Sequence, residues 1–406
     1  MPLRCIVIDF NSYFASVEQQ VNPKLRGKPV AVVPMMADST CCIAASYEAK
    51  KYGVKTGTMV GDAKKMCPGI HLIEAEHGIY IKYHEKLVAA VESCIHVQEV
   101  MSIDEMACEL PTNLRETEQV VALAKKIKKT IAEMVGTELK CSIGAAPNKF
   151  LAKTASDMQK PDGLVLIQQE ELPERLYGLG LRDLCGIGKN MEERLHRHGI
   201  FTVKTLCLAD KDLLRKVWGG YEGERMYERL RGEAIWHPAS KKTCIGHSHV
   251  LAPQKRNETS ALAIVDRLLQ KALMRLRKDG YLAAGLHLTL KYEGRSKWTD
   301  DITFQETQDT LECIRLLHTL WNRRPKHDKN VMAVGVTLFN LVAENNHTLS
   351  LFPRSADRKK LNVVMDKLNK QFGKDTLYYG GAFDALQDAP MRIAFNHIPD
   401  LETEGE

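Results

Sequence analysis

Residues 3–10 read Leu3-Arg4-Cys5-Ile6-Val7-Ile8-Asp9-Phe10, an apolar run that ends beside an acid. Residues 99–106 read Glu99-Val100-Met101-Ser102-Ile103-Asp104-Glu105-Met106, a second such run with two adjoining acids. Both runs have the length and composition of buried strands. A carboxylate at the end of a buried strand costs desolvation energy unless something pairs with it. If the strands are neighbours, Asp9, Asp104 and Glu105 repel one another unless a cation stands between them.

These three carboxylates predict a magnesium site. Hard oxygen ligands that leave coordination positions for water and phosphate suit Mg²⁺. Two such ions, with Mn²⁺ as a substitute, support an in-line displacement at phosphorus. The residue types therefore indicate phosphoryl-transfer chemistry.

The order of the expected elements brings the two strands together. We expect a strand–helix–strand–strand–helix–strand order, which is that of a ferredoxin-like fold. In that order the first strand and the central hairpin are neighbours, although 95 positions separate Asp9 from Asp104. The expected strands are 3–10, a pair within 97–110, 140–146 and 163–167, and the expected helices are 78–95, 115–135 and 148–158.

The chain is too long for one core. It has 406 residues, of which 44% are apolar, so we expect two to four domains. A small region at 22–76 has strand-like runs at 29–33 and 40–44, and a helix-rich region covers 173–236. An α/β region follows, with strands at 282–292, 299–305 and 331–341 and a helix at 309–323, before a C-terminal tail at 353–406.

The positive charge is concentrated in one region. The formal net charge is +6, and residues 241–352 hold 17 Lys and Arg against 11 Asp and Glu. A basic block of domain size indicates a polyanionic partner, and a merely solvated basic surface is the alternative. Within it, Arg267, Lys271, Arg275 and Lys278 follow one face of a helix, which we interpret as a solvated face.

Two glycines in the helix-rich region mark a helix–hairpin–helix pattern. Gly186 and Gly188 would let backbone N–H groups approach a phosphate at the start of a helix, and Lys189 adds a positive charge. An ordinary glycine turn is the alternative, because Gly-x-Gly alone is a weak signal.

The cysteines and the apolar runs indicate a cytosolic protein. The eleven cysteines form no C-x-x-C pair, which is typical of reduced core cysteines. The first apolar run ends at Asp9 and does not resemble a signal peptide. No run is long enough to span a bilayer, so we expect no membrane partner.

Several motifs in their order resemble the Y-family translesion DNA polymerases over nearly the whole chain. They are Asp9-Phe10-Asn11-Ser12-Tyr13-Phe14-Ala15-Ser16-Val17-Glu18, Ser102-Ile103-Asp104-Glu105, Cys141-Ser142-Ile143-Gly144, Asn148-Lys149, Ala152-Lys153 and Lys160-Pro161-Asp162-Gly163. Two segments of the tail, Tyr378-Tyr379-Gly380-Gly381 and Met391-Arg392-Ile393-Ala394-Phe395, are similar to the UmuC-like branch, the catalytic subunits of SOS mutagenic polymerases.

The resemblance implies an α+β, multidomain right-hand polymerase. Its ferredoxin-like palm would comprise residues 1–21 and 77–172, and its small fingers residues 22–76. A helical helix–hairpin–helix thumb would cover 173–236, and a linker 237–244. An α/β little finger would cover 245–352, before the tail at 353–406.

The resemblance also implies roles for single residues. Asp9, Asp104 and Glu105 would bind two Mg²⁺ ions, assisted by the Phe10 carbonyl. The incoming nucleotide would meet six residues: Tyr13, Phe14, Ile43, Tyr47, Lys50 and Lys160. Among these, Phe14 would exclude a 2′-OH as a steric gate, although its pattern alone fits a core aromatic residue.

The partners implied are primer–template DNA, dNTPs and a sliding clamp. Thr348-Leu349-Ser350-Leu351-Phe352 resembles a clamp-binding peptide, with contacts expected at Leu349, Leu351 and Phe352, and a packed strand end is the alternative. A UmuD-like subunit and a recombinase filament are further expected partners, and the expected location is the cytoplasmic nucleoid.

Three functions remain open from the sequence. The first is an active, error-prone and non-processive polymerase in DNA damage tolerance and the SOS response. The second is a non-catalytic accessory protein that binds DNA and the clamp, which the three retained carboxylates disfavour. The third is another enzyme on a ferredoxin-like palm, such as a nucleotide cyclase, which would leave the basic region unexplained.

Overall fold

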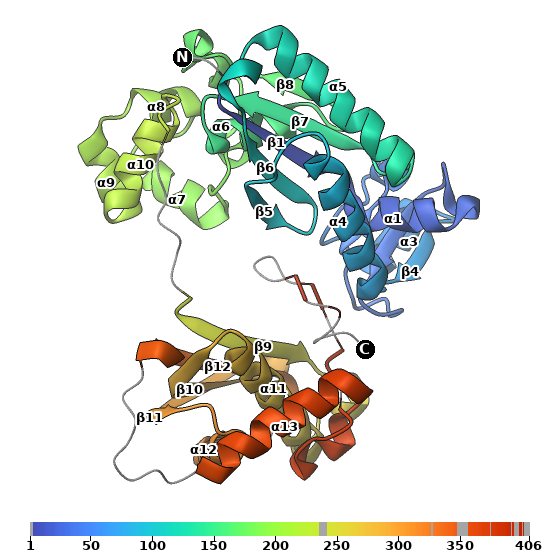
Figure 1. Cartoon of the computed structure of the whole chain (residues 1–406), viewed down its shortest axis with the longest axis vertical. Helices are drawn as coiled ribbons and strands as arrows, with labels where there is room; N and C mark the ends of the chain where they lie inside the picture. The colour runs from blue at the N-terminus through green and yellow to red at the C-terminus, as the bar shows by residue number, and fades with distance from the viewer. Residues whose placement is uncertain are drawn as a thin grey trace. The chain divides into compact units, whose positions relative to one another are not determined.

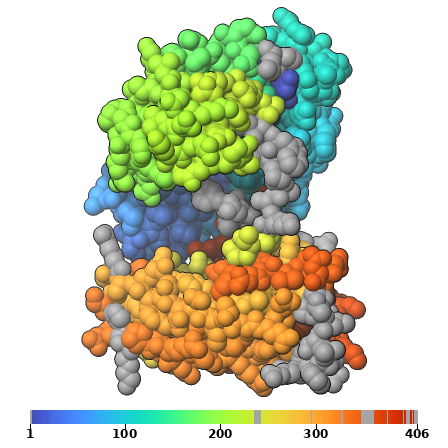
Figure 2. Space-filling model, turned by 90° about the vertical axis from the view of Figure 1, so that its left-hand side faces the viewer, coloured from blue at the N-terminus to red at the C-terminus, as the bar shows by residue number. Residues whose placement is uncertain are grey.

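The computed structural model of the protein describes residues 3–234, 242–325, 328–346, 356–373, 375–390, 392–393, 398–399 and 401. The chain divides into two compact units whose main parts are Met1–His237 and Pro238–Arg392. Figure 1 colours the first unit from blue to yellow-green and the second from yellow to red. Figure 2 shows the surface of the two units from one side in the same colours.

A five-stranded sheet forms the centre of the first unit. Its order is β5 (Glu99–Ser102), β6 (Glu105–Glu109), β1 (Cys5–Phe10), β7 (Cys141–Ala146) and β8 (Leu164–Leu166). Strand β1 is antiparallel to both of its neighbours, and β8 is parallel to β7. Within this sheet, strands β1, β5, β6 and β7 have the ferredoxin-like arrangement. The predicted fold class is therefore confirmed.

Three helices cover this sheet. They are α4 (His77–Glu92), α5 (Thr117–Met134) and α6 (Lys149–Met158). Helices α4 and α5 pack against each other, whereas α6 packs on β1 and β7 (Figure 1). All six residues of β1 are buried, as expected for the central strand of a covered sheet.

A smaller sheet follows helix α1 (Tyr13–Val21). It has the order β3 (Ala44–Ala45), β2 (Val30–Val33) and β4 (His71–Glu74), with the short helices α2 (Tyr47–Lys50) and α3 (Val60–Met66). This region has its own small core of alanine, valine and cysteine side chains. The sequence did not predict β4, whose four residues are only partly buried or exposed.

Four helices complete the first unit, namely α7 (Lys189–Arg197), α8 (Val203–Leu208), α9 (Lys211–Trp218) and α10 (Tyr221–Arg229). Their apolar residues share one core with α6 and with the face of β1 that carries Cys5 and Val7. The helix-rich region therefore packs on the same face of the sheet as α6.

The second unit is a four-stranded antiparallel sheet covered by helices. Its order is β11 (Lys297–Thr307), β10 (Tyr281–Tyr292), β12 (Val331–Ala343) and β9 (Cys244–Val250). Helices α11 (Glu258–Lys278) and α12 (Thr310–Arg323) share a core with this sheet. Short 3-10 helices occur in the two units at 23–25, 112–114, 169–171, 174–176, 181–183, 253–255, 293–295, 344–346 and 380–385.

The C-terminal residues belong to the second unit rather than to a separate tail. Helix α13 (Ala356–Phe372) and the turn at 380–385 lie against α11. Arg277 on α11 forms a two-point ion pair with Asp366, at 2.6 and 2.8 Å, and Arg267 lies 2.8 Å from Asp375. The basic face of α11 was expected to be solvated. This interpretation is wrong for Arg267, which is buried, and for Lys271, which donates to the Ala389 carbonyl at 2.7 Å, whereas Lys278 is exposed.

Within the described residues, no helix combines the length and the apolar character that crossing a membrane requires.

Candidate active site

The position of Asp9 along β1 determines to which face of the sheet its side chain points. Successive side chains of a strand point to opposite faces of the sheet, so Asp9 shares a face with Cys5 and Val7. This face is the one that α6 covers. Asp9 is directly opposite Glu105 in the register of β1 and β6, so the two carboxylates lie side by side on one face. Asp9 is 4% exposed.

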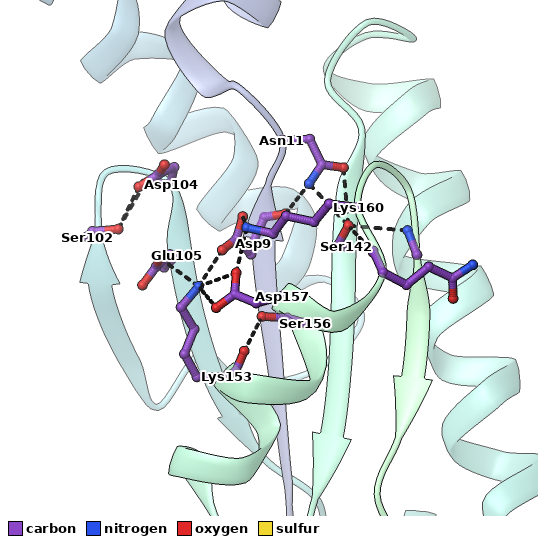
Figure 3. Close-up of polar contacts among 12 residues, drawn as sticks. Asp9, Asn11, Ser102, Asp104, Glu105, Ser142, Lys153, Ser156, Asp157 and Lys160 are labelled. Atoms are coloured by element: carbon purple, nitrogen blue, oxygen red, sulfur yellow. Dashed lines mark hydrogen bonds and ion pairs between the residues drawn. The ribbon is translucent and has the colours of Figure 1, made fainter. Parts of the chain in front are cut away.

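Asp104 lies in the tight turn between β5 and β6. Its carbonyl oxygen accepts a hydrogen bond from the Phe10 N–H at 2.8 Å, which ties the turn to the end of β1. Its carboxylate accepts a hydrogen bond from the Ser102 hydroxyl at 2.7 Å. Figure 3 shows that Asp104 contacts Ser102, whereas Glu105 contacts Lys153.

The surroundings of these acids disfavour their ionised forms. Burial raises the pKa of Asp104, and the charge of Asp9 raises it further. Burial likewise raises the pKa of Glu105, with smaller contributions from Asp9 and Asp104, while Lys153 opposes the shift. Acids that repel one another in a desolvated pocket provide a site for a cation.

Lys153 supplies a positive charge at this point. It lies on α6, and its Nζ is 2.6 Å from Asp9 Oδ2 and 3.0 Å from Glu105 Oε1 (Figure 3). Burial works against the charged form, but Asp9 and Glu105 outweigh it, and the pKa of Lys153 is raised. The lysine therefore joins the carboxylates of two neighbouring strands.

Asp157 connects this lysine to a second one. Lys160 Nζ lies 2.8 Å from Asp9 Oδ1 and 2.8 Å from Asp157 Oδ1. Asp157 also lies 3.0 Å from Lys153, one helical turn earlier on α6. Burial disfavours the charged form of Lys160, but the effect of Asp9 and Asp157 is larger, so the pKa of Lys160 is raised. Two lysines and two aspartates thus form a closed ionic network.

Asn11 holds the turn that carries Lys160. Its side-chain nitrogen donates to the Ser142 hydroxyl at 3.1 Å, and its side-chain oxygen accepts from the Asp162 N–H at 2.8 Å. Asn11 and Ser142 are both buried. This network fixes the end of α6 and the following turn relative to β1.

The sequence interpretation gave no role to Lys153 or Asp157. Their spacing was the available signal, because residues four apart share one helix face, and Lys160 follows three residues after Asp157. What the pattern did not show is that this face of α6 lies over Asp9.

Two residues of the region with the smaller sheet lie near the same charges. Lys50 Nζ is 4.2 Å from the centroid of the Tyr47 ring. Desolvation and the charge of Lys160 lower the pKa of Lys50. Burial raises the pKa of Tyr47, and the charge of Asp9 raises it further, whereas Lys160 opposes the rise. The structure therefore brings Tyr47 and Lys50 close to Lys160 and Asp9.

The two aromatic residues of α1 have different environments. Phe14 is partly buried, and its ring stacks on Tyr80 at a centroid distance of 4.5 Å. Tyr13 is buried, and its hydroxyl donates to the Tyr80 carbonyl at 2.6 Å. The Tyr13 side chain therefore lies in the core, and the expected contact of Tyr13 with a nucleotide stays a prediction.

Ile43 lies beside the short strand β3 and is partly buried. Its N–H donates to the Val32 carbonyl of β2 at 2.9 Å, and its own carbonyl accepts from the Thr56 hydroxyl at 3.3 Å. These contacts hold the backbone of Ile43 to the small sheet of the fingers.

The glycine turn before α7 is open to solvent. Gly186 has a φ of +84°, which favours glycine, and a Cβ added at Gly186 or Gly188 would meet nothing within 4 Å. Gly188 precedes the first residue of α7, Lys189, whose side chain is exposed. The turn therefore presents accessible backbone N–H groups and a positive charge. The clamp-like peptide 348–352 lies outside the described residues.

Comparison with known proteins identifies the family. Residues 8–157 match the impB/mucB/samB family, and residues 242–351 match the C-terminal domain of that family. DNA polymerase IV of Moorella thermoacetica is 31% identical over 92% of this chain and 94% of its own. The chain belongs to the impB/mucB/samB family of Y-family DNA polymerases.

Other relatives agree with this assignment. DNA polymerase IV 1 of Bacillus subtilis is 30% identical over 96% of this chain and 95% of its own. A Y-family DNA polymerase chimera of Dbh and Dpo4 superposes with a TM-score of 0.70 at 25% identity, covering 84% of this chain and 99% of its own. The relatives are named DNA polymerase IV, so they support the family and leave the UmuC-like branch as a prediction.

Proposed function

We propose that this Y-family chain is a translesion polymerase that adds deoxynucleotides to a primer by a two-metal reaction in the palm. Curated relatives named DNA polymerase IV support a DNA-directed DNA polymerase. The main support for a metal-dependent reaction is the position of Asp9 opposite Glu105 on adjacent strands. A lysine ammonium group lies between the two carboxylates.

The donor set fits divalent magnesium. Asp9, Asp104 and Glu105 offer hard oxygen atoms, and their mutual repulsion is relieved by positive charge. Among the described residues, no three acidic, histidine or cysteine side chains form a ready metal cage. We attribute this to Lys153, which engages two of the acids, and to Ser102, which engages the third.

The three carboxylates and the Phe10 carbonyl are the proposed ligands, with Mn²⁺ as a substitute for Mg²⁺. When bound, the ions would activate the primer 3′-OH and stabilise negative charge on the oxygens of the phosphoryl group. Lys153 would release Asp9 and Glu105 and keep its contact with Asp157, whose Oδ2 lies 3.0 Å from the Lys153 Nζ.

The nucleotide would lie between palm and fingers residues of the first unit. Lys160, Lys50 and Tyr47 would hold its triphosphate, since they surround the charge of Asp9. The Phe14 ring, held by Tyr80, would close the space beside C2′ of the sugar. Ile43 would face the base pair.

Primer–template DNA is the proposed macromolecular substrate. One solved relative is an insertion ternary complex of Dbh DNA polymerase, which matches with a TM-score of 0.58 at 25% identity. The exposed turn of Gly186, Gly188 and Lys189 would meet a DNA phosphate, a contact that is independent of base sequence. The basic second unit would add further phosphate contacts.

We propose the domain limits expected from the sequence, with residues 356–390 reassigned to the little finger because they pack on α11. The UmuC-like branch, the error-prone SOS role, the nucleoid location and the clamp, UmuD-like and recombinase partners also remain proposals. Their support is the motif at 378–381 and the clamp-like peptide at 348–352.

Primer extension with Mg²⁺ and dNTPs tests the proposal. Wild type should extend an undamaged template, whereas Asp104→Ala should bind DNA and fail to extend it. Equal extension by both proteins would exclude the carboxylate site. If neither protein extends the primer, even with clamp and recombinase filament added, the accessory function would replace the proposal.

A further inference from the structure

The second unit contains a cavity between α11 and the C-terminal residues that cover it. The cavity has a volume of about 380 Å³, which is within the range of small-molecule sites. Its walls come from α11, from α13 and from residues 375–382. The residues proposed for the palm chemistry do not line this space.

Polar contacts hold both walls in place. Arg277 pairs with Asp366 through two hydrogen bonds, and it also donates to the Thr310 hydroxyl at 3.0 Å. The Gln270 side chain accepts from the Tyr379 N–H at 2.9 Å and donates to the Tyr379 carbonyl at 3.3 Å. The cavity is therefore enclosed by elements that are anchored to each other.

The lining combines positive charge with an apolar floor. Among the described residues that line the cavity, seven are lysine or arginine and three are acidic. The apolar part is formed by Met274, Val363, Met365, Leu377 and Ala382. This combination favours a ligand that has an anionic group and an apolar body.

Two buried side chains have unused hydrogen-bonding atoms in this lining. Arg267 is 4% exposed. Its Nη1 forms an ion pair with Asp375 at 2.8 Å, and neither Nη1 nor the buried Nε has a hydrogen-bond partner. Asn362 is 2% exposed; its oxygen accepts from the Tyr379 hydroxyl at 3.3 Å, while its side-chain nitrogen has no partner. Unsatisfied buried donors are costly, and a ligand acceptor would remove that cost.

We propose that this cavity binds a small organic anion. Its anionic group lies at Arg267 and Asn362, and its apolar body lies against Met274 and Val363. The site is separate from the carboxylates of the palm, so the inference does not depend on the polymerase reaction.

Two dyes of the same shape test the site. The probes are 8-anilinonaphthalene-1-sulfonate and its uncharged counterpart N-phenyl-1-naphthylamine, titrated into the full chain while fluorescence is recorded. Wild type should bind the sulfonate about tenfold more tightly than the neutral dye, which corresponds to about 1.4 kcal/mol. Arg267→Gln should bind both dyes with similar affinity.

Control variants locate the binding. Val363→Trp should fill the cavity and weaken both dyes, and this variant keeps the test valid if Arg267→Gln does not fold. Arg323→Gln on α12, outside the lining, should behave as wild type, as should Asp104→Ala. Equal affinity of wild type for the two dyes, or tight sulfonate binding by Val363→Trp, would overturn the proposal.

Discussion

The ammonium nitrogen of Lys153 lies 2.6 Å from Oδ2 of Asp9, so a helix of the palm provides the counter-charge for a carboxylate of its central strand. The same nitrogen reaches Glu105 at 3.0 Å. The repulsion between the two acids is therefore balanced from within the chain. The same carboxylates therefore affect both the stability of the metal-free protein and the proposed metal-dependent activity.

Replacing Lys153 by methionine should destabilise the protein in metal-free buffer. The side chain is 12% exposed, and its loss leaves Glu105 without its lysine partner and Asp9 with Lys160 alone. Breaking a buried ion pair of this kind costs about 3 kcal/mol. Thermal unfolding should show this loss in EDTA and a partial recovery in Mg²⁺. The exposed Lys129→Met is the control, and equal stability of the two variants would contradict the role of Lys153.

Replacing Asp157 by asparagine should weaken nucleotide binding more than turnover. Asp157 holds Lys160 at 2.8 Å and Lys153 at 3.0 Å, so its loss removes one anionic partner from each lysine. We expect KM for dNTP to rise about tenfold, with a smaller change in kcat. Asp157→Glu should restore part of the affinity. The exposed Asp62→Asn is the control, and a change confined to kcat would oppose a positioning role.

Replacing Phe14 by alanine should admit ribonucleotides. The ring stacks on Tyr80, and its removal opens the space proposed to exclude the 2′-OH. We expect the preference for dNTP over rNTP, measured as a ratio of kcat/KM, to fall about a hundredfold. Phe383→Ala, an exposed change in the second unit, provides the control. An unchanged ratio would show that another residue forms the gate.

Asp104→Asn should stabilise the metal-free protein at neutral pH. Burial and the nearby Asp9 raise the pKa of Asp104 above its ordinary value. The folded state then holds the proton more tightly than the unfolded state, so this group's contribution to stability is lost as the pH rises through its folded pKa. The variant should therefore melt a few degrees above wild type at pH 7 in EDTA, and the gain should vanish at acidic pH. A gain that does not depend on pH would contradict this origin.

Replacing Arg277 by methionine should loosen the C-terminal residues. This arginine forms two hydrogen bonds to Asp366 and one to the Gln308 carbonyl. Its loss should cost about 2 kcal/mol in the unfolding of the second unit. Amide exchange in α13 should accelerate, while α12 keeps its protection. Arg323→Met is the matched control, and equal exchange rates in α13 would show that its apolar contacts suffice.

The elements of the palm were predictable because their signals are local. The apolar runs around Ile6 and Ile143 have the composition of buried strands, and the helix that follows β7 begins at an Asn148 cap, as its sequence indicates. Strand β4 was missed because His71–Glu74 pairs in parallel with β2, and that partner is forty residues away. Such a strand has little local signal of its own.

The residue types of the site were predictable, but its ionic network was not. Asp9, Asp104 and Glu105 stand out because acids are rare in apolar strands. Lys153 and Asp157 resemble ordinary surface charges of a helix. Their role depends on the face that α6 turns towards β1, and this orientation results from packing in a core shared with the helix-rich region.

The sequence by itself therefore determined the order of the strands and helices of the palm, the family and the three carboxylates, because periodicity and residue type are properties of short segments. The tertiary structure decided which charges meet. It placed Lys153 between Asp9 and Glu105, moved Tyr13 into the core, and buried Arg267 beneath residues that the sequence presented as a tail. Contacts between distant segments depend on how whole faces pack, and no single segment contains that information.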